Sequence, residues 1–111
     1  MSLERFTVVR VPFPFTDREA SKHRPALVLS TAKFNASAGH AVMAMITSAA
    51  HAPWPLDCPI ADLKAAGLSA PSIVRMKLFT LDLRLSRGEL GRLSPEDAAL
   101  VRDRLEGLFV A

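Results

Sequence analysis

The sequence predicts a small, mostly β domain (β with small helices) in which five or six short strands form a strongly bent sheet that closes into a barrel. Three observations predict this class. The chain has 111 residues, which suits a single domain over residues 1–111 and leaves little room for a second core. Half of its residues are hydrophobic, and they come in short runs separated by proline, glycine and polar clusters. The tail carries the clearest apolar stripe at helical spacing.

The first predicted strand is residues 6–15, FTVVRVPFPF. Thr7, Val9 and Val11 share one parity with two phenylalanines, while Arg10 and two prolines share the other. This alternation predicts a strand with one buried face, and the prolines place its end at a sheet edge or in an extended loop. The polar stretch that follows, TDREASKH, predicts a loop.

Two continuous apolar runs, residues 25–30 and 41–47, predict central strands buried on both sides. The segment between them ends at Gly39 and predicts a short helical turn or loop. Residues 72–78 and 80–85 alternate again and predict two more strands, each with one apolar side. The residues expected to point inward from these two strands are Val74, Met76, Leu78, Leu81, Leu83 and Leu85.

Residues 57–60 are expected to add a short strand, and residues 61–66 two helical turns closed by Gly67. The tail predicts the clearest helix, because Ser94 is a good N-cap and Pro95 suits the first helical position. The apolar stripe of this helix consists of Ala98, Val101, Leu105 and Leu108.

Composition restricts the function further. Lys and Arg outnumber Asp and Glu by 14 to 11, giving a net charge of +3, which favours a polyanionic partner without identifying it. The single cysteine, Cys58, excludes an intrachain disulfide and is expected to be a packing residue. The three histidines and one cysteine show neither HxxxH nor CxxC spacing, so the sequence predicts no metal site. No cofactor is expected. No apolar run reaches the length of a membrane span, so we expect a cytoplasmic protein without a membrane partner.

Three motifs are similar to those of a known family when they are taken together. They are VPFPFTD at 11–17 followed by HRPALVLS at 23–30, then ITS at 46–48, then GLSAPSIVRMKLFTLD at 67–82. In this order the chain resembles, nearly from end to end, the MazF/PemK (Kid-like) toxins of type II toxin–antitoxin systems. The resemblance implies a small SH3-like barrel, a homodimer, and metal-independent endoribonuclease cleavage of single-stranded RNA (mRNA) at short motifs by 2′-OH attack. It also implies a cognate antitoxin protein, with DNA contacted only indirectly through the antitoxin complex.

The chain departs from the family pattern at two places. Family members often open the first strand with Gly-Asp, where this chain has Phe6 and Thr7. In Kid-like members an acidic residue implicated in catalysis follows two residues after the arginine matched by Arg75. Here that position holds Lys77, so an acid–base role is not carried over to it.

Arg24 and Thr47 are the catalytic candidates. Metal-free RNA cleavage needs a proton acceptor for the 2′-OH, a proton donor for the leaving oxygen and a cation at the phosphorane. Arg24 suits the cation, because its planar fork matches phosphate oxygens, and the family's key arginine occupies this position before Pro25. Thr47 ends an apolar run, so its hydroxyl is available to a phosphate or a 2′-OH, with Ser48 as a helper. The alternatives are a solvated charge beside a strand and a strand threonine with a satisfied hydroxyl.

Further candidates contact the substrate. Arg75 and Lys77 share one strand face about 7 Å apart, which suits two successive phosphates or, equally, an ordinary solvated face. His23 lies beside Arg24 and is either a proton carrier or a solvated loop histidine. His40 and His51 belong to no such constellation and are expected to be structural or surface residues.

Trp54 lies between two prolines and is a candidate for stacking on a base or gripping an antitoxin, whereas Phe15 is expected in the core. The matched motifs add Thr16, Asp17 and Pro25 as substrate-binding candidates. Two other functions stay open. One is a protein-binding toxin of the same fold, like the gyrase poisons, against which the RP and ITS motifs argue. The other is a degenerate member without turnover, which Lys77 keeps open.

Overall fold

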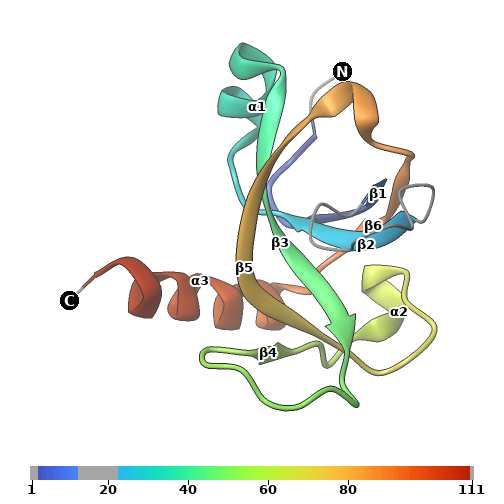
Figure 1. Ribbon diagram of the computed structural model, residues 1–111, viewed down its shortest axis with the longest axis vertical. Coiled ribbons are helices and arrows are strands. Elements are labelled where there is room, and N and C mark those ends of the chain that lie inside the picture. Colours follow the sequence, from blue (N-terminus) through green and yellow to red (C-terminus); the bar gives the residue numbers. More distant parts are fainter. Residues whose placement is uncertain (1–2, 13–22, 111) are drawn as a thin grey trace.

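The computed structural model describes residues 3–12 and 23–110, which form one six-stranded antiparallel sheet with three α-helices. The strands are ordered β4-β5-β3-β2-β1-β6 across the sheet. Figure 1 shows the long strands β3 and β5 bending side by side through the molecule, with β1, β2 and β6 grouped together and α3 across one end. The elements are β1 Thr7–Pro12, β2 His23–Val28, α1 Ala32–Ala38, β3 His40–Ser48, β4 Cys58–Pro59, α2 Leu63–Ala66, β5 Ser72–Asp82, a 3₁₀ turn Leu83–Leu85, β6 Glu89–Arg92 and α3 Pro95–Phe109. The predicted mostly β barrel with a C-terminal helix is confirmed.

Apolar side chains pack on both faces of the sheet. One cluster includes Ala98 and Val101 of α3, and Leu27 of β2 belongs to it. A second cluster contains Ala26 and Val28 from the same strand. The central strands β2 and β3 are therefore buried on both sides, as their continuous apolar sequences predict. β2 begins two residues earlier than predicted, at His23, and ends at Val28.

The prediction that β1 has a single buried face is wrong. Val8 is fully buried in the first cluster, while Val9 and Val11 are fully buried in the second. The reason is that α3 contributes to the cluster on one face of β1, while β2, β3 and β5 contribute apolar side chains to the cluster on the other. Arg10 stays exposed.

The two strands predicted at 72–78 and 80–85 are one strand, β5, followed by a 3₁₀ turn. Ala44 of β3 pairs with Leu78, but the next residue, Met45, pairs with Arg75, so β5 holds two extra residues at this point. Such a bulge bends a strand without ending its pairing. Leu81 points inward as expected, whereas Leu85 is 41% exposed and does not.

The helix ends follow the predicted capping residues. Gly39 and Gly67 close α1 and α2 in the left-handed conformation, with φ of 67° and 74°. The Ser94 hydroxyl accepts the backbone N–H of Asp97 at the start of α3. The buried Asp97 carboxylate in turn accepts the N–H groups of Ala61 and Asp62, both at 3.0 Å, so α3 is tied to the segment before α2.

The end of α2 lies directly on β6. A Cβ on Gly67 would be 1.9 Å from the Leu90 carbonyl oxygen, and a Cβ on Gly91 would be 2.3 Å from the Ala65 carbonyl oxygen. Two backbones can approach this closely only where both side chains are absent. This glycine contact fixes the start of the segment 67–72, which forms a wall of the site described next.

Candidate functional site

Two pockets lie on either side of Arg24. We call them the Arg10 pocket, of about 560 Å³, and the Thr47 pocket, of about 210 Å³. The Arg10 pocket is lined by Arg10, His23, Arg24, Pro25, Gly67, Leu68, Ser69, Ala70, Ser72 and Leu90. The Thr47 pocket is lined by Arg24, Pro25, Ile46, Thr47, Ser48, His51, Ala70, Pro71 and Ser72. The two share Arg24, Pro25, Ala70 and Ser72, and so form one continuous groove.

Strand pairing explains why these residues meet. β2 and β3 are antiparallel, with Ala26 opposite Met45, so the start of β2 lies beside the end of β3. The end of β3 also pairs with the start of β5, where Ser48 lies opposite Ser72. One side chain from each of the three matched motifs therefore lies at the same end of the barrel: Arg24, Thr47 and Ser72.

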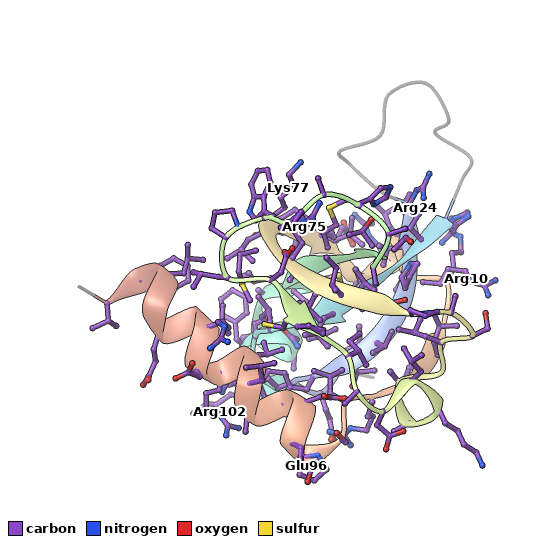
Figure 2. The ribbon with its side chains drawn as sticks, turned by 90° about the horizontal axis from the view of Figure 1, so that it is seen from below. Arg10, Arg24, Arg75, Lys77, Glu96 and Arg102 are labelled. Atoms are coloured by element: carbon purple, nitrogen blue, oxygen red, sulfur yellow. The ribbon has the colours of Figure 1, made fainter. Side chains whose placement is uncertain are left out.

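Arg24 belongs to β2, whereas the predicted strand begins after it, at residue 25. It lies opposite Val11 in the β1–β2 ladder, which fixes its backbone, while its side chain is exposed and faces both pockets. Within the described part of the chain, no carboxylate forms an ion pair with it. Figure 2 shows Arg10 close to Arg24 at this end of the molecule, with Glu96 and Arg102 far away on α3.

Thr47 is half-buried near the end of β3, and its Oγ1 lies 2.8 Å from Nδ1 of His51. The expectation that His51 stands apart from the other candidates is therefore wrong. A turn brings it back: the His51 N–H donates to the Ser48 carbonyl, and the Ala50 N–H donates to the Ser48 hydroxyl. A serine that opens a turn is a recognisable sequence feature, but it does not by itself indicate which side chain will fold back.

Arg75 is buried and held by internal partners, which fits neither of the two alternatives expected for it, a phosphate contact or a solvated strand face. Its Nε and Nη2 donate to the two carboxylate oxygens of Asp57 at 3.2 and 3.0 Å, and Nη2 also donates to the Ala52 carbonyl at 2.8 Å. Asp57 is 18 residues from Arg75. The spacing of Arg75 and Lys77 in β5 therefore gave no indication of this ion pair.

Trp54 is 41% exposed and is flanked by both cations of β5. The Arg75 guanidinium carbon lies 5.7 Å and the Lys77 Nζ 4.7 Å from the ring centre, within the range of cation–π attraction. Lys77 and Trp54 are thus one surface feature, and Figure 2 shows Lys77 next to Arg75. Thr16, Asp17 and Phe15 lie outside the described residues.

The similarity to known proteins extends over almost the whole chain. Residues 4–109 match a protein-family model, the PemK-like, MazF-like toxin of type II toxin-antitoxin system. The chain belongs to this toxin family. The resemblance inferred from the three motifs is therefore confirmed. A comparison with curated proteins gave no match.

Solved structures similar to this PemK-like, MazF-like toxin include MazE-MazF (Form-II) from Deinococcus radiodurans, with 27% identity and a TM-score of 0.75 over 99% of this chain and 97% of that one. MazF (Form-I) from the same organism has 24% identity and a TM-score of 0.76, over 100% and 99% of the two chains. An endoribonuclease in complex with its cognate antitoxin, from Mycobacterial species, has 18% identity and a TM-score of 0.77, over 99% and 98%. The MazF-like fold is thus shared with toxins that have been crystallised with antitoxins.

Outside the groove, Cys58 of the toxin has a strongly perturbed pKa. Burial in the first core cluster raises the pKa of its thiol from 9.0 to about 11, and the thiol donates weakly to the Leu56 carbonyl. The prediction that Cys58 is a packing residue is confirmed. Within residues 3–12 and 23–110, no three His, Cys, Asp or Glu side chains are grouped to hold a metal ion, and no helix is long and apolar enough to cross a membrane.

Proposed function

We propose that this toxin is an endoribonuclease that cleaves single-stranded RNA by attack of a ribose 2′-hydroxyl on the adjacent phosphate. The observation that carries the proposal is the convergence of the Arg24 guanidinium and the Thr47 hydroxyl on one pocket. In this reaction the bond from the 2′-oxygen to phosphorus forms and the bond to the 5′-oxygen breaks. The products are a 2′,3′-cyclic phosphate and a 5′-hydroxyl.

Arg24 would bind the scissile phosphate. Its fork of N–H donors matches two phosphate oxygens, and its charge opposes the negative charge that grows on the phosphorane. Pairing of its backbone with Val11 supports this role, because it holds the base of the side chain at the wall that the two pockets share. Thr47, across the same pocket, would contact the 2′-hydroxyl.

The Arg10 pocket would hold the neighbouring nucleotide. Its volume of about 560 Å³ lies within the range of small-molecule sites, and Arg10 and His23 line it next to the shared Arg24. Two arginines and a histidine along one groove provide positive charge for successive phosphates of a single strand. Ser48 and Ser72 add hydroxyl groups to the other wall.

Antitoxin binding and dimerisation belong to the same proposal. The similar structures include toxin–antitoxin complexes, which supports a cognate antitoxin that blocks the groove. The exposed Leu108, Phe109 and Val110 at the end of α3 are apolar surface that an interface would cover, which supports a homodimer.

Single-stranded RNA incubated with the pure protein in EDTA tests the proposal. We expect cleavage to persist in EDTA, because Arg24 supplies the charge at phosphorus and every proposed step uses the chain's own groups. Arg24→Ala should abolish cleavage, and Arg24→Lys should also be poor, since a point charge does not reproduce a two-pronged phosphate contact. Arg102→Ala is the matched control, because it removes an arginine on α3, far from the groove.

The outcomes separate the possible functions. Cyclic phosphate ends would support 2′-hydroxyl attack. Loss of cleavage in EDTA with recovery on adding Mg²⁺ would contradict the mechanism. Intact RNA with the natural protein, despite toxicity in cells, would favour a toxin that acts by binding a protein.

A further inference from the structure

A hydrogen bond joins the side chains of Thr47 and His51 in the groove. The 2.8 Å distance between Oγ1 and Nδ1 is the usual length for a bond between a hydroxyl and a ring nitrogen. Both residues line the Thr47 pocket, on the same side of Arg24. His51 is exposed, so its ring also has access to water.

The direction of this hydrogen bond determines what Thr47 can do. A threonine hydroxyl has one proton and two lone pairs, whereas a neutral imidazole has one N–H and one acceptor nitrogen. If Nδ1 is the acceptor, the threonine proton is held by His51, and Oγ1 can only accept from a substrate. A hydroxyl that accepts a hydrogen bond from the RNA 2′-OH and donates one to an imidazole can pass a proton from the 2′-oxygen to the imidazole.

We propose that His51 is the proton acceptor for RNA cleavage and acts through Thr47. This inference rests on the proposed function. As the 2′-oxygen attacks phosphorus, its proton passes to Thr47 Oγ1, and the threonine proton passes to His51 Nδ1. The bond to the 5′-oxygen breaks, that oxygen takes a proton from water, and the exposed His51 ring returns its proton to solvent. Arg24 stays protonated throughout.

Among the described residues, the lining around His51 combines apolar side chains with hydroxyl groups and contains one charged side chain, Arg24. β2 contributes Arg24, β3 contributes the hydroxyls of Thr47 and Ser48, and the segment 70–72 contributes the hydroxyl of Ser72. No carboxylate belongs to the described lining of this pocket. Histidine is the side chain that exchanges a proton near neutral pH, which suits it to this position. The other histidine of the groove, His23, lies in the Arg10 pocket.

The test is the single-turnover cleavage rate from about pH 5 to about pH 9, where histidine titrates. For the natural protein we expect the rate to rise with pH and then level off. His51→Gln should lower the plateau by about a hundredfold, the lower range for a general base, and should remove the dependence on pH in the acid limb. His40→Gln is the control, since His40 lies at the opposite end of β3, seven residues or roughly 20 Å from Thr47.

Substitutions of Thr47 test the route through its hydroxyl. Thr47→Ser should keep most of the rate and the pH profile. Thr47→Val should resemble His51→Gln, and the double variant should be little worse than either single one, because the two residues act in one step. Nitrogen-15 NMR of the imidazole provides a readout besides cleavage: His51 should carry its proton on Nε2 at high pH, and Thr47→Val should abolish that preference.

A His51→Gln protein that keeps its rate and its acid limb would overturn the role of His51. A loss of rate with an unchanged pH profile would also overturn it, because it would mean that His51 only shapes the turn. Either result, with Arg24→Ala inactive, leaves RNA cleavage itself standing. If the natural protein cleaves no RNA, the proposed function fails and this inference fails with it.

Discussion

Replacing Asp57 by alanine should destabilise the protein strongly, because it leaves the buried Arg75 guanidinium without its carboxylate. Asp57 accepts two hydrogen bonds from Arg75 and one, at 3.0 Å, from the backbone N–H of Trp54. The side chains of Arg75 and Asp57 are only 9% and 16% exposed. This carboxylate therefore ties the loop that carries Trp54 to β5.

The magnitude follows from what remains after the substitution. Removing one partner of a buried pair costs about 3–5 kcal/mol when the other charge is left uncompensated. Arg75 keeps the Ala52 carbonyl at 2.8 Å, so we expect a cost at or just below the bottom of this range, about 2–3 kcal/mol. For a domain of this size such a loss lowers the unfolding temperature by about 10 °C.

Thermal and urea unfolding of four proteins measures the effect: natural, Asp57→Ala, Arg75→Met and the double variant. The double variant should be more stable than the sum of the single effects predicts, by about 2 kcal/mol, because no unpaired charge is left. Arg84→Ala breaks the shorter but exposed pair with Asp82 and should change the unfolding midpoint far less. Additive single effects, or an Asp57→Ala protein as stable as the natural one, would refute the reasoning.

Three other predictions concern different parts of the molecule. Lys77→Met should weaken RNA binding and reduce the slope of log K against log salt concentration by about 0.7, the value for one phosphate contact on a single strand. Cleavage at saturating RNA should be nearly unchanged. A Lys77→Asp protein that cleaves much faster would mean that the natural site is degenerate. Cys58 should not react with a thiol reagent at neutral pH until the protein unfolds. Because its folded pKa is raised from 9.0 to about 11, stability should be unaffected below pH 9 and fall as pH rises towards 11, and a fall on acidification in its place would contradict this assignment. Light scattering at micromolar concentration should give twice the 12.0 kDa mass of the chain, and a particle of 12.0 kDa would refute the dimer.

The sequence was most informative where a local rule determines the structure. Ser94 and Pro95 predicted the start of α3, and Gly39 and Gly67 predicted the ends of α1 and α2, because capping depends on a few consecutive residues. The family resemblance also indicated that Arg24 and Thr47 lie close together, and both line one pocket, while their catalytic roles stay a prediction.

Features that depend on contacts between distant residues were missed. Arg75 has the sequence position of a surface cation, and only the loop that brings Asp57 to it makes it an internal ion pair. The bulge in β5 is visible only in its pairing with β3. From the sequence alone, the alternating leucines that follow it suggested a second strand, although β5 continues. His51 was missed because a turn, and not a strand or helix period, returns it to Thr47.

The glycine contact between α2 and β6 has a consequence for motion. β4 and β6 are the outer strands of the sheet, so within the described residues no ladder of hydrogen bonds joins them, and the barrel is closed on that side by packing. Packing without a ladder opens at lower free energy than paired strands do. Amide hydrogens of α2 and of the segment 67–72 should therefore exchange with solvent earlier than those of β2 and β3. The segment 67–72 lines both pockets. A ligand bound in the groove should therefore also slow hydrogen exchange at amides of this region that the ligand does not contact.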